Sequence, residues 1–261
     1  MTDRRTNAAK WALHAHYSRM LGKDGQLMAQ RQQAGTMTAD LVGEIAKEYD
    51  VTRSIPVVCP QWGPQSNEAE WVDRHRALIA AAINDTAWDS DIATRAGQCR
   101  TLVQSLADAM APSLKKDRKT TVSFASGLTK LSWFDAPDGR WTLFDKYARR
   151  AVIGSGTGDA LDKMKQFYKA LEERGFNDVF DAISQAIAPL NVPLHPGKII
   201  DHYLMACCPD KGETSNDFNL GNQATGELLD RYLIPEAAAL LNTCARKVEQ
   251  ALIDTPLAKA A

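Results

Sequence analysis

Apolar side chains recur at intervals of three and four residues along most of the chain, which is the spacing that places them on one face of a helix. Between residues 38 and 49, for example, Leu41, Val42, Ile45 and Tyr49 follow it. The predicted helices cover residues 5–21, 38–49, 67–83, 122–134, 158–174, 176–188, 197–207 and 225–253, with one or two more between 85 and 111 and another opening at Asp145. The alternation typical of strands is nearly absent, so the pattern predicts an all-α fold.

Prolines and glycines mark the interruptions between these helices. Residues 51–67 contain three prolines and a glycine, which favours an extended loop, with a short strand as the alternative. Pro137, Asp138 and Gly139 predict a turn between two helices. No internal repeat or low-complexity tract divides the chain, so residues 1–261 are expected to form one unit, as one domain or two closely packed lobes.

The composition is that of an ordinary globular protein, with 44% hydrophobic and 24% charged residues among 261. No apolar run approaches the ~20 residues that a bilayer span requires. The N-terminus is basic but lacks the apolar core of a signal peptide. We therefore expect a cytoplasmic protein without a membrane partner.

The residues that usually bind metals show no metal-binding pattern. The five cysteines are scattered and lack C-x-x-C spacing, so free thiols are expected and neither a disulfide framework nor a metal site is predicted. His14 and His16 are two residues apart and should lie on different helix faces, and the other three histidines are isolated in the sequence. We expect no metal and no cofactor.

A glycine-rich stretch at residues 151–160 raises the possibility of a nucleotide-binding loop. Gly154, Gly156 and Gly158 give G-x-G-x-G, whereas the dinucleotide fingerprint is G-x-G-x-x-G and requires a preceding strand. Asp159 stands where the third glycine should be. The stretch therefore predicts a helix stop followed by a loop.

The net charge of −1 conceals an uneven distribution. Residues 111–150 contain nine Lys/Arg and four Asp/Glu, a balance of +5, and the rest of the chain contains 22 against 28, or −6. A basic segment on an otherwise acidic protein is typical of a DNA-binding surface, although a solvated charged face has the same composition.

This basic part of the chain, residues 113–151, also holds the most promising chemistry. A lysine-rich turn precedes an apolar helix, which is followed by the Pro137–Gly139 turn and by Asp145 at the start of a second helix. Asp is a frequent helix N-cap, and capping alone would explain Asp145. Arg149 and Arg150 follow within two turns, so a carboxylate lies among cations that suit a phosphate backbone.

The sequence TLFDKYARRA resembles the segment of the helix–hairpin–helix DNA glycosylases that reads approximately Pro-Val-Asp-x-His-Val-x-Arg, in which the Asp is catalytic. In that register Asp145 matches the aspartate, Tyr147 the histidine, and Arg149 or Arg150 the later arginine. The preceding SFASGLTKLSWF is similar to the helix after the hairpin, especially in bacterial relatives of the 8-oxoguanine glycosylases. The resemblance covers about 40 residues and implies a two-lobed helical fold with a cleft between the lobes. It also implies double-stranded DNA as the partner and base flipping followed by base excision.

Two departures from the family pattern change the expected chemistry. The Gly-x-Gly hairpin is missing, and KKDRKTT stands in its place. In bifunctional members a lysine precedes the aspartate by 18 or 19 residues, and the position of that lysine is Gly127 here. Lys130, one turn later, is the only nearby substitute for the missing amine. The resemblance therefore implies a monofunctional glycosylase that leaves an abasic site.

The remaining candidate residues are assigned to DNA contact or to the base pocket. The candidates for DNA contact are Lys115, Lys116, Arg118, Lys119, Thr120, Arg149 and Arg150. The candidates for the base pocket or for intercalation are Gln61, Trp62, Gln65, Asn67, Gly127, Lys130 and Tyr147. An aromatic ring there would stack on a flipped base and an amide would fill the gap in the duplex, although a loop tryptophan such as Trp62 also often packs on the core.

Two functions remain open at the level of sequence. The first is a DNA glycosylase, expected to be a monomer. Its altered motif suggests a modified base as substrate, such as one carried by phage DNA that a defence enzyme attacks. The alternative is a helical DNA-binding or protein-interaction module without catalysis, which the missing hairpin glycines and the weak overall basicity favour.

Overall fold

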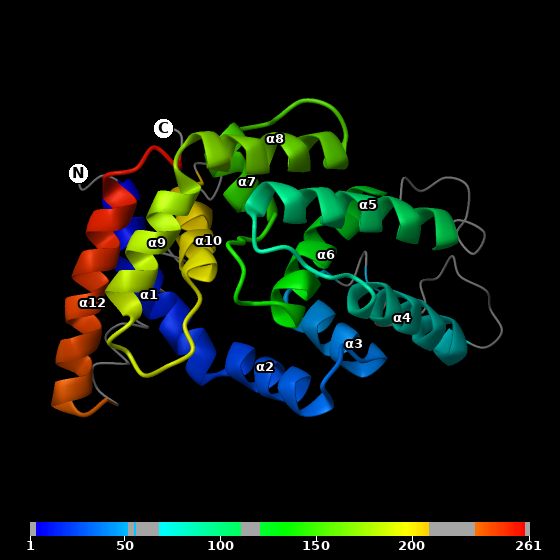
Figure 1. Cartoon of the computed structure of the whole chain (residues 1–261), viewed down its shortest axis with the longest axis horizontal. Coiled ribbons are helices and arrows are strands. Elements are labelled where there is room, and N and C mark those ends of the chain that lie inside the picture. Colours follow the sequence, from blue (N-terminus) through cyan, green and yellow to red (C-terminus); the bar gives the residue numbers. More distant parts are fainter. Residues whose placement is uncertain (1–3, 52–54, 56–67, 111–120, 209–232, 259–261) are drawn as a thin grey trace. The chain divides into compact units, whose positions relative to one another are not determined.

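The computed structural model describes residues 4–51, 55, 68–110, 121–208 and 233–258, and these residues form helices joined by turns and loops, with no strand among them (Figure 1). The all-α prediction is thus confirmed for this part of the chain. The chain divides into two compact units, which we name the terminal unit (Met1–Asp24, Arg140–Gly156 and Gln166–Ala261) and the middle unit (Gly25–Gly139 and Thr157–Lys165).

The terminal unit is built around α10 (Pro196–Cys207). This helix packs against α1 (Arg4–Leu21), α7 (Lys146–Ile153) and α9 (Phe176–Ile187), and α12 (Pro235–Ile253) packs on α1 and α9. A helix surrounded in this way must bury nearly all of its faces. Ten of its twelve residues are buried, including Lys198, Asp201 and His202.

The middle unit has α6 (Thr121–Asp135) at its centre. This helix contacts α3 (Ala39–Glu48), α4 (Glu68–Asn84) and α5 (Ile92–Met110). Its apolar side chains from Phe124 to Phe134 are buried, and the guanidinium of Arg95 on α5 donates a 2.5 Å hydrogen bond to the Ser132 carbonyl oxygen. At its C-terminal end, Asp135 accepts hydrogen bonds from Arg31 and from the indole of Trp88.

Short polar side chains begin several of these helices. Thr38 caps α3, and Asp159 caps α8 (Ala160–Glu173), where its carboxylate accepts from the backbone N–H of Leu161 at 2.8 Å. At the other end of a helix, Gly154 follows α7 with a positive φ of 67°. Residues other than glycine rarely adopt such a φ, and the helix ends at this glycine, so the predicted helix stop is confirmed.

Most predicted helices are found within a few residues of their expected bounds, but there are three differences. The helix α2 (Lys23–Ala34) was not predicted. Residues 85–91, expected to be helical, precede the start of α5 at Ile92. Leu21 and Leu78, which helical spacing places in line with the apolar residues of the predicted helices 5–21 and 67–83, are 56% and 38% exposed. Of the predicted helix 225–253, only the part from Pro235 is seen, and residues 225–232 lie outside the described residues.

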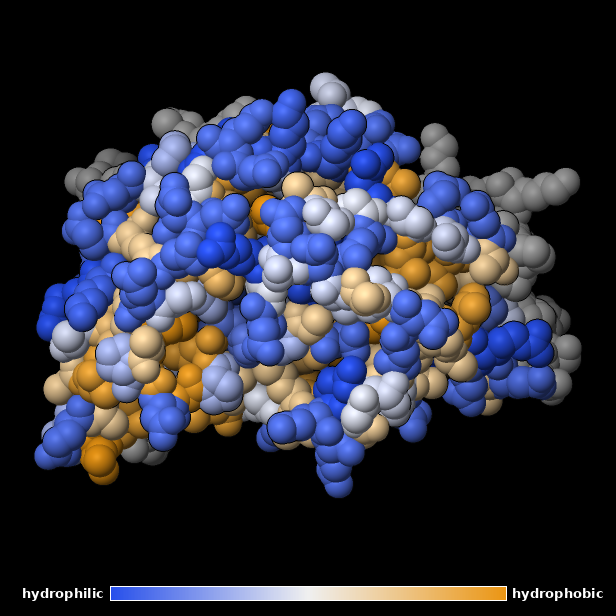
Figure 2. Space-filling view, viewed as in Figure 1, coloured by the Kyte–Doolittle hydropathy of each residue, from blue (hydrophilic) through white to orange (hydrophobic). Residues whose placement is uncertain are grey.

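The surface view shows hydrophilic side chains over α8, whereas apolar side chains reach the surface around α9 and α12 (Figure 2). Among the helices of the described residues, none combines the length and the apolar character needed to cross a membrane. Cys99, Cys207, Cys208 and Cys244 carry free thiols, as predicted, and burial raises the pKa of Cys99 to about 12. A thiol with so high a pKa is not a nucleophile near neutral pH.

Candidate active site around Asp145

An extended segment, residues 141–144, leads to Asp145 and is anchored within the terminal unit. Trp141 is buried and stacks on Tyr168 with 4.5 Å between ring centroids and an interplanar angle of 16°. The Tyr168 hydroxyl donates a 2.9 Å hydrogen bond to the Thr142 carbonyl oxygen, and Phe144 packs edge-on against Phe167. Because Trp141 and Phe144 hold both ends of the segment against α8, it has little freedom to move, as expected of a segment that presents a reactive group.

The segment also lies in direct backbone contact with α10. A Cβ atom placed on Gly197 would lie 1.6 Å from the Trp141 carbonyl oxygen, so only glycine allows this approach. Gly197 is the second residue of α10, after Pro196. The first turn of α10 therefore determines where the segment that leads to Asp145 can lie.

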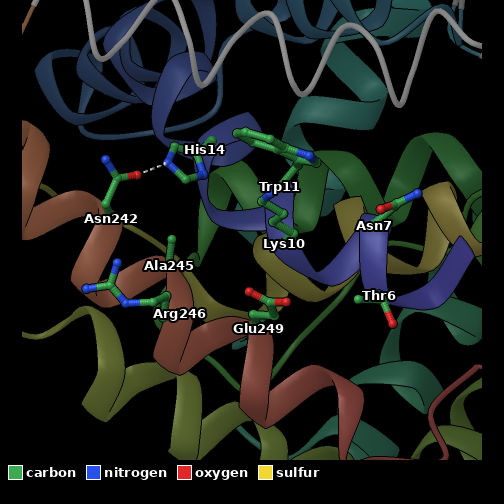
Figure 3. A pocket seen from close by; sticks show the side chains of 9 residues that line it. All are labelled: Thr6, Asn7, Lys10, Trp11, His14, Asn242, Ala245, Arg246 and Glu249. Atoms are coloured by element: carbon green, nitrogen blue, oxygen red, sulfur yellow. Dashed lines mark hydrogen bonds between the residues drawn. The ribbon is translucent and has the colours of Figure 1, made fainter. Parts of the chain in front are cut away.

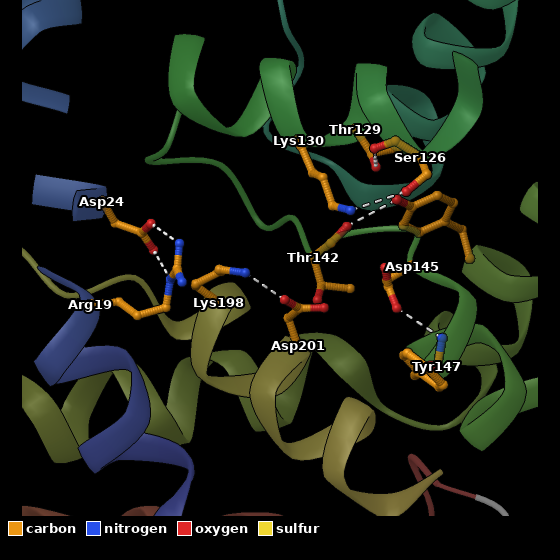
Figure 4. Close-up of polar contacts among 11 residues, drawn as sticks. Arg19, Asp24, Ser126, Thr129, Lys130, Thr142, Asp145, Tyr147, Lys198 and Asp201 are labelled. Carbon is orange, nitrogen blue, oxygen red and sulfur yellow. Dashed lines mark hydrogen bonds and ion pairs between the residues drawn. The ribbon is translucent and has the colours of Figure 1, made fainter. Parts of the chain in front are cut away.

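Asp145 is the N-cap residue of α7. Its φ and ψ of −102° and 158° are extended, and its Oδ1 accepts a 2.8 Å hydrogen bond from the backbone N–H of Tyr147 (Figure 4). The carboxylate is half-buried. The cap hydrogen bond therefore orients the carboxylate at the N-terminus of α7.

Cationic residues follow this carboxylate along the helix that it caps. Burial lowers the pKa of Arg149, and Arg150 lowers it further, whereas Asp145 raises it. Arg149 and Arg150 are half-buried, and Lys146 is exposed. An arginine remains charged in spite of such a shift, so α7 combines one carboxylate with two guanidinium groups within two turns.

Tyr147, Gly127 and Lys130 are the predicted pocket residues that the structure describes. Tyr147 is half-buried beside Asp145, with its ring 5.5 Å from the Lys146 amine. Gly127 and Lys130 are buried on α6 in the middle unit. The Lys130 amine lies 3.2 Å from the Ser126 hydroxyl and 5.7 Å from the centre of the Tyr49 ring. It is therefore engaged in contacts within its own unit.

The other predicted site residues lie outside the described residues. These are the loop candidates Gln61, Trp62, Gln65 and Asn67, and the basic turn with Lys115, Lys116, Arg118, Lys119 and Thr120.

A buried polar cluster on α10 was not anticipated from the sequence. The Lys198 amine and the Asp201 carboxylate form a 2.6 Å ion pair, with side-chain exposures of only 3% and 1%. Nearby, the His195 backbone N–H donates to His16 Nε2 at 3.0 Å, and the His16 ring lies 6.1 Å from that of His202. Two of the histidines that are isolated in the sequence, His195 and His202, are thus neighbours of His16 in the fold.

The electrostatics of this cluster oppose protonation of His16. Burial is the largest cause that lowers its pKa, followed by the charges of His202, His195, Lys198 and Arg19. Arg19 is held by Asp24 through hydrogen bonds of 2.9 and 2.6 Å. Within the described ranges, no group of three or more His, Cys, Asp or Glu side chains has a geometry that could hold a metal ion.

The sequence signal that could have pointed to the cluster is a charged pair, Lys198 and Asp201, within an otherwise largely apolar helix. Lys198 and Asp201 are three residues apart, which places them on one helix face, but such pairs are common on exposed helices. The apolar residues around them, Ile199, Ile200, Tyr203 and Leu204, fill the other faces of α10 and indicate a helix buried all round. A charged pair on a fully buried helix was therefore readable from the sequence.

No family model, no curated protein and no solved structure matches the chain.

Proposed function

We propose that this protein is a DNA glycosylase in which Asp145 is the catalytic carboxylate. The observation that carries the proposal is the placement of Asp145 at the N-cap of an arginine-bearing helix, at the end of a segment anchored by Trp141 and Phe144. In the helix–hairpin–helix glycosylase segment that TLFDKYARRA resembles, the catalytic aspartate matches Asp145. The proposal includes the two-lobed fold with a DNA cleft that this resemblance implies.

In the proposed reaction, one nucleotide rotates out of the duplex and its sugar lies beside Asp145. As the N-glycosidic bond breaks, the bonding electrons leave with the base and positive charge develops on the sugar. The carboxylate stabilises this charge and accepts a proton from the attacking water as the oxygen of that water bonds to the sugar carbon. The proton then passes through solvent to the departed base, which restores the carboxylate. Arg149 and Arg150 neutralise neighbouring phosphates. The products are a free base and an abasic site.

A monofunctional reaction fits the residues of α6 better than a lyase reaction. Gly127 has no amine, and the amine of Lys130 is buried against Ser126 and Tyr49. A lysine that attacks a sugar must be accessible and at least partly deprotonated. Water is therefore the proposed nucleophile.

The proposed substrate is a damaged or modified base in double-stranded DNA, and modified phage DNA is the first substrate to test. The missing hairpin glycines and the missing lysine motivate this choice, because they separate the chain from the pattern of the repair enzymes it resembles. The proposal also includes a cytoplasmic location and a monomeric enzyme.

The test is incubation of the protein with DNAs that carry different damaged or modified bases, followed by alkali, which breaks the strand at abasic sites. The key variant is Asp145→Asn. Asparagine caps a helix as well as aspartate does, so this variant keeps α7 intact and removes only the charge. We expect the strand breaks to disappear while DNA affinity changes little.

The matched control is Asp159→Asn, which makes the same substitution at the N-cap of α8. Because Asp159 lies outside the proposed site, this variant should cut as the native protein does. Breaks that persist in Asp145→Asn would refute the mechanism. If the native protein binds DNA but cuts none of the DNAs, the non-catalytic DNA-binding module becomes the better explanation.

A further inference from the structure

The terminal unit contains a cavity of about 600 Å³ between α1 and α12 (Figure 3). Its main polar and aromatic lining consists of Lys10, Trp11 and His14 from α1 and Asn242, Arg246 and Glu249 from α12. Neither Asp145 nor any other residue of the proposed glycosylase site lines it. Its volume is in the range of sites that bind small molecules, roughly 300–1,000 Å³.

One wall of the cavity is aromatic and cationic. The Trp11 indole is partly exposed, and its ring centroid lies 5.2 Å from that of His14 at an angle of 56°. The Lys10 amine lies over the indole ring, 5.1 Å from its centre. The exposed lysine has a flexible stem and can move from the ring face to an anionic group, so that a flat aromatic ligand with a negative charge can stack on the indole and pair with the amine.

The inner part of the cavity is polar although it lies where two helices meet. His14 is only 3% exposed, and its Nε2 lies 3.1 Å from Asn242 Oδ1, so the pair connects α1 to α12. Burying a histidine and an amide costs more free energy than an apolar contact between the same helices. Because His14 and Asn242 bond each other across the two helices, the pair fixes the inner wall of the cavity.

The charges define the ligand further. Lys10 and Arg246 are exposed cations on the two opposing helices, and Glu249 contributes the only carboxylate among the lining residues described. The two cations suit a phosphate group, which Glu249 would repel. A carboxylate instead accepts hydrogen bonds from N–H groups, which nucleobases carry on their edges. A ligand that suits both the cations and the carboxylate has a phosphate at one end and a base with N–H donors at the other.

We propose that the α1–α12 cavity binds a nucleotide, with its base against Trp11, its phosphate between Lys10 and Arg246, and Glu249 accepting from N–H groups of the base. The nucleotide is either a free nucleoside monophosphate or one residue of a single DNA strand, since both present the same groups. The site does not depend on Asp145, so it stands or falls separately from the glycosylase activity.

The test is calorimetric titration of the full chain with deoxyguanosine monophosphate, with deoxyguanosine, and with a single-stranded octanucleotide. We expect a dissociation constant on the order of 10–100 μM for the nucleotide, which is typical of a small open site. Lys10→Gln and Arg246→Gln should each weaken binding at least about tenfold, because each removes a charge-assisted contact to the phosphate. Both side chains are exposed, so neither change should disturb folding.

Three controls make the result decisive. Lys247→Gln removes an exposed cation from α12 outside the cavity lining and should leave affinity unchanged. Deoxyguanosine, which has no phosphate, should bind weakly and should not respond to Lys10→Gln. Trp11→Leu should weaken all ligands, and circular dichroism verifies that it folds.

The pattern of binding also identifies the source of the ligand. Binding of the monophosphate that is lost in the Lys10 and Arg246 variants supports a free nucleotide. If only the octanucleotide binds, with the same dependence on Trp11 and Lys10, the ligand is part of a strand. Absence of binding to both, or binding that none of the three variants weakens, would overturn the proposal.

Discussion

Gly197→Ala should unfold the terminal unit more readily and should displace the segment that carries Asp145. The added Cβ would lie 1.6 Å from the Trp141 carbonyl oxygen, whereas real Cβ contacts essentially never fall below 3.0 Å. The helix and the segment must therefore separate by at least about 1.4 Å along that contact. Neither partner can swing aside, because both are backbone atoms.

Two effects compete in this substitution. Alanine is preferred over glycine inside a helix by about 1 kcal/mol, which would stabilise the variant. Overpacking of a closely packed contact costs roughly 1–3 kcal/mol and more where the backbone must move. Because the backbone must move on both sides of the contact, the cost of the clash should exceed the gain in helix propensity, with a net loss of about 2 kcal/mol in the free energy of unfolding. For a chain of this size that loss corresponds to a decrease in Tm of roughly 4–8 °C.

A thermal melt followed by circular dichroism measures this effect, and Gly97→Ala is the matched control. Gly97 lies within α5, and a Cβ added there meets nothing within 4 Å. That variant should gain stability, by up to about 1 kcal/mol. If Gly197→Ala also melts at or above the native temperature, the close approach of α10 to Trp141 does not exist as described.

Two further predictions concern the buried cluster on α10. Lys198→Met leaves Asp201 as an uncompensated buried carboxylate and should lower the free energy of unfolding, measured in urea, by about 3–5 kcal/mol. Lys198→Met combined with Asp201→Leu should recover most of that loss. If the losses of the two substitutions simply add, the pairing is refuted. Because the pKa of His16 is lowered in the folded state, the unfolded state takes up a proton first as pH falls below about 6.5, and stability should decrease there by up to about 1.4 kcal/mol per pH unit. His16→Gln should make that part of the pH profile shallower, and an unchanged slope would contradict the assignment.

The helices of this protein were largely predictable because their apolar residues recur with helical spacing, and the exceptions have physical reasons. The missed helix α2 buries Leu27 and Asp24 and otherwise presents half-buried or exposed side chains, so it has no apolar stripe to detect. The stretch before α5 was expected to be helical, but Asp91 accepts a hydrogen bond from the backbone N–H of Thr94 and begins the helix there. A capping residue inside a polar stretch is hard to distinguish from an ordinary helical one.

The candidate site was predictable only where a local rule determines the structure. Asp145 as an N-cap follows from its own side chain and the helix after it, and the structure confirms that cap. The His16–His195 contact joins residues that are 179 positions apart, and it exists only because α1 packs on α10. No spacing rule reaches that far, so the three histidines appeared isolated.

Packing between residues far apart in the sequence also explains why α10 matters for the proposed function, although it supplies none of the proposed catalytic groups. Its second residue, Gly197, lies so close to the Trp141 backbone that even a Cβ would not fit between them, and ten of its twelve residues are buried among the surrounding helices. A helix packed on nearly all of its faces can shift only if its close-packed neighbours shift with it. A helix that resists shifting, in contact with the segment that ends at Asp145, holds that carboxylate in place more firmly than the single cap hydrogen bond from Tyr147 could. Positional precision of this kind is what a catalytic carboxylate needs and what a carboxylate serving only as a helix cap does not.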